Sequence, residues 1–110
     1  MHPFMFVIKG IPLPENHNYG TIGGANIHIW VISDNISNAK DNALSFIQKY
    51  LWKPQSVEHA FEILPEQIPQ LHGDEAKLYQ KALQNGIAAD FLAYPIVDGN
   101  PNDPIKFGRP

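Results

Sequence analysis

Residues 25–33 read ANIHIWVIS, and the fold prediction starts from this stretch. Every second residue from Ile27 to Val31 is β-branched and apolar, and His28 and Trp30 lie between them. This two-residue alternation predicts a β-strand whose side chains point to opposite faces of a sheet. The stretch is the clearest strand in the chain, and the other elements are placed around it.

The segments on either side of this strand predict a hairpin followed by a helix. Phe4–Ile8 is aromatic and β-branched, which favours a first strand, and residues 12–24 form a long Pro-, Asn- and Gly-rich loop before the second. After this strand, Ser33-Asp34-Asn35 and also Ser37 offer turn and N-cap chemistry, and apolar residues recur every three or four positions from Ile36 to Leu51. We therefore expect a wide hairpin and then one amphipathic helix.

The second half of the chain predicts a strand, a helix and a last strand. Residues 55–64 alternate like a strand, residues 66–71 (EQIPQL) suit either a short edge strand or a turn, and residues 87–94 form the last strand. The second helix begins near Asp74 and ends at Asn85-Gly86, a typical left-handed C-terminal cap. We expect a single α+β domain over residues 1–97 and an irregular tail over 98–110. The predicted order ββα(β)βαβ suits an antiparallel sheet of four to five strands with both helices on one face.

Residues 26–94 resemble small, uncharacterised bacterial domains of ferredoxin-like type. The resemblance is carried by packing and capping residues: Ala39, Ala43, Leu51-Trp52, Tyr79, Ala82 and Gly86-Ile87-Ala88. It implies a ferredoxin-like fold and a tendency to dimerise. It transfers no catalytic residue.

Composition excludes several classes of protein. The chain has no cysteine, which excludes a disulfide scaffold, a thiolate metal site and a cysteine nucleophile. The net charge is −3, and Lys and Arg are not clustered, so we expect no nucleic-acid partner. The apolar run Phe4–Ile8 is too short for a signal peptide or a membrane span. We expect a cytoplasmic protein with no membrane contact, no cofactor and no bound metal.

Alternation gathers one set of chemically active side chains on the sheet face that the predicted helices leave open. These residues are His28, Trp30, Glu58, Glu62, Asp90 and Tyr94. An imidazole, three carboxylates and two aromatic rings suit an acid/base or metal site, and equally a dimer interface or a solvated sheet face. A shift of one residue in any strand would dissolve the set.

The long loop carries a second, smaller candidate. His17 and Tyr19 lie on it, and loops on a rigid sheet often contact ligands. His59 falls on the apolar face of its strand and reads as a packed or edge histidine. Gly23 and Gly24 lead into a strand and not into a helix, so a glycine-eased turn is favoured over a phosphate-binding loop.

Three functions are compatible with these features. The first is a non-catalytic homodimeric module that binds a protein through the open sheet face or an edge strand. The acidic second half, with a balance of −4 from Pro54 onward, would suit a toxin-neutralising partner of a basic target. The second is a small metal-assisted or acid/base enzyme that pairs His28 with Glu58, Glu62 or Asp90. The third is a small-molecule sensor whose long loop closes over a ligand.

Overall fold

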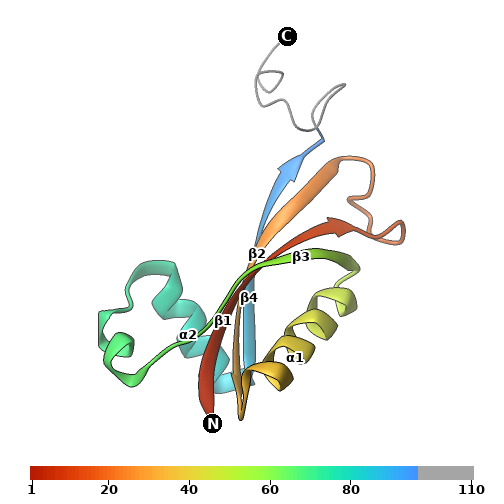
Figure 1. Ribbon diagram of the computed structural model, residues 1–110. Helices are drawn as coiled ribbons and strands as arrows, with labels where there is room; N and C mark the ends of the chain where they lie inside the picture. The colour runs from red at the N-terminus through yellow and green to blue at the C-terminus, as the bar shows by residue number, and fades with distance from the viewer. Residues whose placement is uncertain (97–110) are drawn as a thin grey trace.

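The computed structural model describes residues 1–96, which form one four-stranded sheet with two α-helices and a 3₁₀ helix (Figure 1). In chain order the elements are β1 His2–Pro12, β2 Ile22–Ser33, α1 Ile36–Lys49, β3 Trp52–Glu62, η1 Pro65–Gln70, α2 Gly73–Asn85 and β4 Ile87–Pro95. The sheet is antiparallel, with strand order β3-β1-β2-β4. No helix in this part of the chain is both long and apolar enough to cross a bilayer. The tail predicted at 98–110 lies outside the described residues.

The predicted α+β class and antiparallel sheet are confirmed, and the elements differ from the prediction mainly in their ends. β1 and β2 pair as a hairpin, but both strands are longer than predicted, so the loop between them shortens to residues 13–21. The ambiguous EQIPQL segment is the 3₁₀ helix η1, and the described residues therefore contain four strands and no fifth. Asn35 caps α1 by accepting the amide of Asn38 at 2.8 Å.

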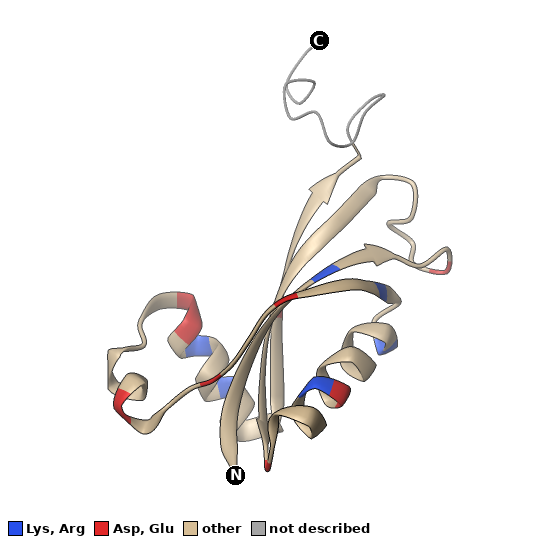
Figure 2. Cartoon of the chain, viewed as in Figure 1, with Lys and Arg blue, Asp and Glu red and all other residues tan. Residues whose placement is uncertain are grey.

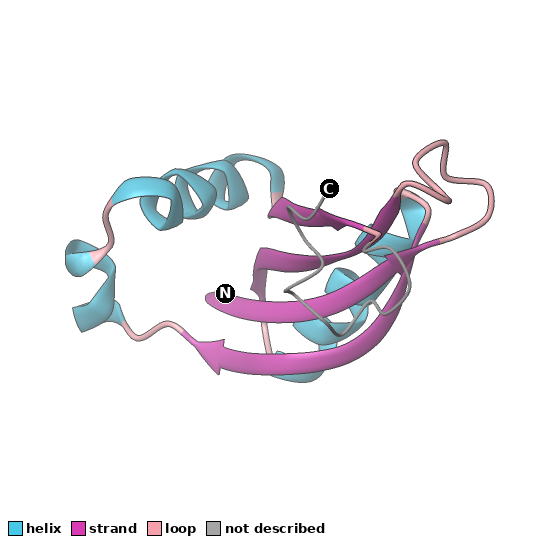
Figure 3. Cartoon of the chain, turned by 90° about the horizontal axis from the view of Figure 1, so that it is seen from above, coloured by secondary structure: helices cyan, strands magenta, loops and turns pink. Residues whose placement is uncertain are grey.

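The two α-helices lie on opposite faces of the sheet, so the prediction that both cover one face is wrong (Figure 1 and Figure 3). Buried Ala43 and Ile47 of α1 pack in one core with Ile29 of β2, whereas Leu78 of α2 packs in a second core with Trp30. The reason lies at the C-terminal end of β2, where Ile29 and Val31 point to one face and Trp30 and Ile32 to the other. Each face of the central strand therefore needs its own cover.

The strand order also differs from the ferredoxin-like arrangement. In the observed sheet the hairpin of β1 and β2 forms the centre, and β3 and β4 are the edges. The ferredoxin-like fold implied by the resemblance is therefore not confirmed. What remains is the coarser description, an antiparallel four-stranded sheet with one α-helix on each face.

Candidate functional site

The α2 side of the sheet is covered at one end and uncovered at the other. Trp30 lies across from Met5 and Ala88 in the row of side chains beneath α2, and it is only 1% exposed. Figure 1 shows both α-helices against the lower half of the sheet, with the strands extending beyond them. The burial of this face falls with distance from α2.

Two further rows of side chains cross all four strands at and beyond the first turn of α2, where the helix covers the sheet only in part. We call these eight residues the exposed sheet face: Val7, Lys9, Asn26, His28, Ser56, His59, Asp90 and Leu92. The first row runs His59–Val7–His28–Asp90, and the second runs Ser56–Lys9–Asn26–Leu92. Every residue of the second row is exposed, and Leu92 keeps 49% of its surface accessible.

The first row places a half-buried aliphatic side chain between two imidazoles. Val7 lies directly across from His28 on β2 and from His59 on β3. Directly opposed residues in antiparallel strands have Cβ atoms about 5 Å apart, so these three side chains form one continuous strip. Among the described residues neither imidazole makes a side-chain hydrogen bond or an ion pair. Both rings therefore have donor and acceptor capacity for a partner.

His28 and Asp90 also border a small cavity against the first turn of α2. They are direct cross-strand neighbours, and Asp74 and Glu75 of α2 line the same cavity of about 180 Å³. Lys77 lines an adjoining hollow with Asp74, so the carboxylates have a cationic neighbour. Sequence reasoning missed Asp74 and Glu75, because strand alternation does not tell where a helix lies over the sheet.

The structure brings only part of the predicted site together. Ladder register places Asp90 and Tyr94 on the same face as His28 and Trp30. Trp30 is covered by α2, with its ring centroid 5.9 Å from that of Tyr79, so it offers no surface to a partner. The ring of Tyr94 lies over Gly24 of β2. A Cβ atom built on Gly24 would be 2.8 Å from the Cζ atom of Tyr94, so the ring occupies the space that a larger residue would need.

Two predicted carboxylates belong to β3, which is separated from the His28 strand β2 by β1. Glu62 pairs with Phe4 on the α1 side of the sheet, where its Oε2 is 3.3 Å from Nδ1 of His2. Glu58 lies in a break of the β1–β3 register and accepts a hydrogen bond from the Ser56 hydroxyl. The predicted face of Glu62 was wrong, because the register break between Val57 and His59 reverses the alternation along β3. Glu58 stays beside Ser56 of the exposed sheet face. Of the predicted acid/base partners of His28, Asp90 is the one that lies directly across from it in the ladder.

The loop candidate is ordered by backbone and side-chain hydrogen bonds. Asn16, which is 7% exposed, donates from Nδ2 to the carbonyl of Leu51 at 3.2 Å and accepts the amide of Asn18 at 2.9 Å. Tyr19 lines an apolar cavity of about 430 Å³ beside the loop, and His17 is exposed and does not line it. The two predicted loop residues therefore share no site.

The described residues contain no group of three or more His, Asp or Glu side chains arranged to bind a metal ion. The exposed sheet face carries instead a mixture of aliphatic, imidazole, amide and charged groups on a hydrogen-bonded sheet. Such a surface is suited to contact with another macromolecule. Comparisons of this chain with protein-family models, with curated proteins and with solved structures found no match.

Proposed function

We propose that this protein is a non-catalytic interaction module that acts as a homodimer and binds a protein partner on the exposed sheet face. The observation that carries the proposal is the uncovered end of the α2 side of the sheet. There Val7 and Leu92 present apolar surface between polar groups from all four strands. The backbone beneath them is fixed by ladder pairing, so a partner would bind at little ordering cost.

The charges around the face favour a partner with an asymmetric charge pattern. Asp90 lies at the β4 end of the face, next to Asp74 and Glu75 of α2, whereas Lys9 lies on β1 in the neighbouring row. Figure 2 shows that acidic and basic residues are scattered over the described chain and form no single-sign field. Basic groups on the partner would meet the acidic border beside α2. A basic toxin-like target fits this part of the proposal.

The proposal is tested by a matched pair of leucine substitutions. Leu92 lies on the exposed sheet face and is 49% exposed, whereas Leu83 lies on α2 and is 51% exposed. We expect Leu92→Lys to lower recovery of a specific co-purifying protein about tenfold, the effect of losing roughly 1.4 kcal/mol of binding free energy. Leu83→Lys should retain that protein at the wild-type level. Quantitative mass spectrometry of tagged protein purified from its native cells provides the measurement.

The result that overturns the partner site is the absence of any protein whose recovery distinguishes Leu92→Lys from Leu83→Lys. The homodimer is tested separately by light scattering of the purified wild-type chain, whose monomer mass is 12.3 kDa. A dimer at micromolar concentration supports the proposal, and a monomer at every concentration contradicts it.

A further inference from the structure

We infer that two copies of the chain associate by antiparallel pairing of their β4 strands about a two-fold axis at Phe91, with side chains of α1 packing across that axis. The inference rests on the homodimer of the proposed function and adds the surface that forms it. It concerns the edge of the sheet and not the exposed sheet face. The two surfaces can therefore be tested independently.

The two edges of the sheet differ in how well they resist pairing. β3 has two breaks in its register with β1, contains Pro54, and carries charged residues at Lys53, Glu58 and Glu62. Bulges, proline and charge are the features by which edge strands avoid association. β4 pairs with β2 without a register break from Ile87 to Tyr94, and Asp90 is its one charged residue. β4 is therefore the edge that can accept another strand.

The backbone groups of β4 that point away from β2 can be identified from one hydrogen bond. The amide of Ile32 donates to the carbonyl of Gly86 at 2.9 Å, and these two residues lie directly beyond the last ladder pair, Val31 and Ile87. In an antiparallel ladder the bonded pairs recur every second residue. The β4 residues bonded to β2 are therefore those at even positions. The residues between them point their N–H and C=O groups outward: Ile87, Ala89, Phe91 and Ala93. No described strand pairs with this side of β4.

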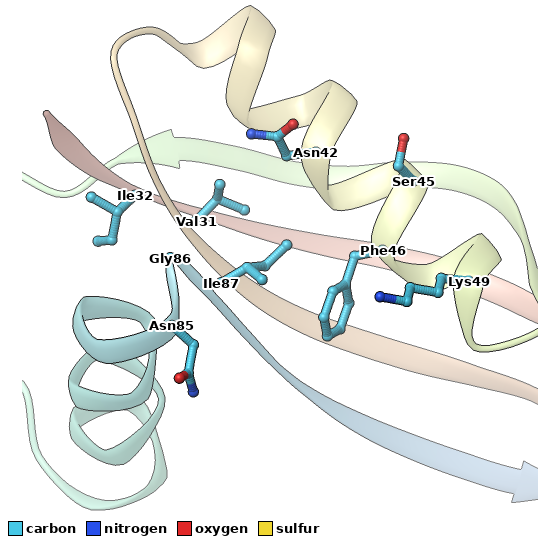
Figure 4. A pocket seen from close by; sticks show the side chains of 9 residues that line it. All are labelled: Val31, Ile32, Asn42, Ser45, Phe46, Lys49, Asn85, Gly86 and Ile87. Carbon is cyan, nitrogen blue, oxygen red and sulfur yellow. The ribbon is translucent and has the colours of Figure 1, made fainter.

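The side chains of the same residues face a groove between β4 and α1. α1 packs mainly against β1, β2 and β3, so it covers the adjacent side of β4 only in part, and Ile87, Ala89 and Phe91 are half-buried there. Figure 4 shows Phe46 and Lys49 extending from α1 over a cavity of about 380 Å³ whose floor includes Val31 and Ile87. Two-fold pairing of β4 would bring the α1 helix of the second copy to the opposite side of this groove.

An aromatic cluster extends the groove along β4. The ring of Tyr50 lies 4.9 Å from that of Phe46 and 6.2 Å from that of Phe91, measured between centroids, and Tyr50 is 54% exposed. A stable dimer needs about 800 Å² of buried surface per partner, more than a backbone ladder of one short strand supplies. The exposed aromatic surface provides the additional apolar contact.

The charge on β4 selects the register. With the two-fold axis at Phe91, Asp90 lies opposite Leu92 of the second copy. The outward N–H and C=O groups of one strand then lie opposite the outward groups of the other, so they can form hydrogen bonds. An axis at position 90 would also keep the phase, but it would place two Asp90 carboxylates directly opposite each other, and such a like-charge pair is destabilising. Position 91 is also the middle of β4, so this register pairs the strand over its full length.

A matched pair of proline substitutions tests the edge. Ala93 has an amide on β4 that points away from β2. On β3, the amide of Ile63 donates to the carbonyl of Pro3, so odd-numbered residues near it bond to β1 and the amide of Ala60 points outward. Both alanines are exposed. Proline at either position removes an amide that the sheet does not use. We expect Ala93→Pro to weaken dimerisation at least about tenfold in light scattering, while Ala60→Pro stays dimeric.

A cysteine substitution provides a second measurement that does not depend on the fold of the proline variants. The chain contains no cysteine, so Phe91→Cys and the control His59→Cys each introduce a single thiol. Bonded pairs in antiparallel ladders have Cα atoms about 5.5 Å apart, within the range that a disulfide spans. We expect mild oxidation to give covalent dimers from Phe91→Cys and not from His59→Cys.

The outcomes separate this inference from the proposed function. A wild-type chain that is monomeric overturns the homodimer and the β4 interface together. A wild-type dimer that survives in a folded Ala93→Pro variant, or that gives no covalent product from Phe91→Cys, overturns the β4 interface and leaves the homodimer standing. Loss of the dimer in Ala93→Pro together with trapping at position 91 supports both.

Discussion

Asn16 shows how one buried amide side chain fixes the loop between β1 and β2. Its two hydrogen bonds join the loop to the carbonyl of Leu51 and to the amide of Asn18. Leu51 can present that carbonyl because its φ is +68°, a conformation that is uncommon for a residue other than glycine. A second bond from the Leu13 amide reaches the same carbonyl at 2.9 Å. The loop is thus attached to the turn that follows α1.

We expect Asn16→Ala to lower the free energy of unfolding by about 1–3 kcal/mol, because it removes both hydrogen bonds of a buried side chain and leaves the Asn18 amide without its partner. His17→Ala, at the exposed neighbouring position, should change stability by less than about 0.5 kcal/mol. Urea unfolding of both variants measures the difference. Equal stabilities of the two variants would show that the loop does not depend on the Asn16 hydrogen bonds.

Single residues on regular ladders were predictable from the sequence, and those near irregular ladders were not. The shared face of His28 and Asp90 followed from two-residue alternation, since β2 and β4 pair without interruption there. In β3 a register break lies between Val57 and His59, so these residues face opposite sides although they are two positions apart. Alternation in the sequence does not reveal such a break.

At the scale of elements, the ends of the helices followed from local chemistry. Asn35, one of the predicted N-cap candidates, caps α1, and α2 ends at Gly86, whose φ is +84° and whose amide donates to the carbonyl of Ala82 at 2.7 Å. The EQIPQL segment was harder, because Pro65 before it and Pro69 within it suit an edge strand, a turn or a 3₁₀ helix about equally. Which face α2 covers was not predictable, because the C-terminal end of β2 has apolar side chains on both faces.

The cap of α2 gives an element-scale prediction. A Cβ on Gly86 would meet no atom within 4 Å, so Gly86→Ala tests the left-handed backbone conformation alone. We expect a loss of about 1 kcal/mol in the free energy of unfolding. Asn85→Ala, at the helical position just before, should be close to neutral. Thermal unfolding that leaves Gly86→Ala as stable as wild type would contradict the assigned role of the cap.

At the scale of the whole molecule, the sheet separates two cores of unequal size. The core on the α1 side contains eleven buried residues, and the core on the α2 side contains five. Regions with fewer buried apolar contacts open at lower free-energy cost than the rest of a domain. The layer formed by η1 and α2 should therefore be the less stable layer of the fold. It also borders the exposed sheet face.

Native-state hydrogen exchange tests this order of stability with one substitution in each core. Leu78 of α2 is 8% exposed and Ile47 of α1 is fully buried, and truncation of either side chain to alanine should cost about 2–5 kcal/mol. Leu78→Ala should speed exchange mainly in η1 and α2, because that layer can open while β1, β2 and α1 stay paired. Ile47→Ala should speed exchange throughout the described chain, because its core supports both central strands. Equal loss of protection in α1 and α2 after Leu78→Ala would show that the two layers unfold as one unit. Selective opening of α2 would instead uncover Trp30 and enlarge the apolar part of the surface proposed to bind a partner.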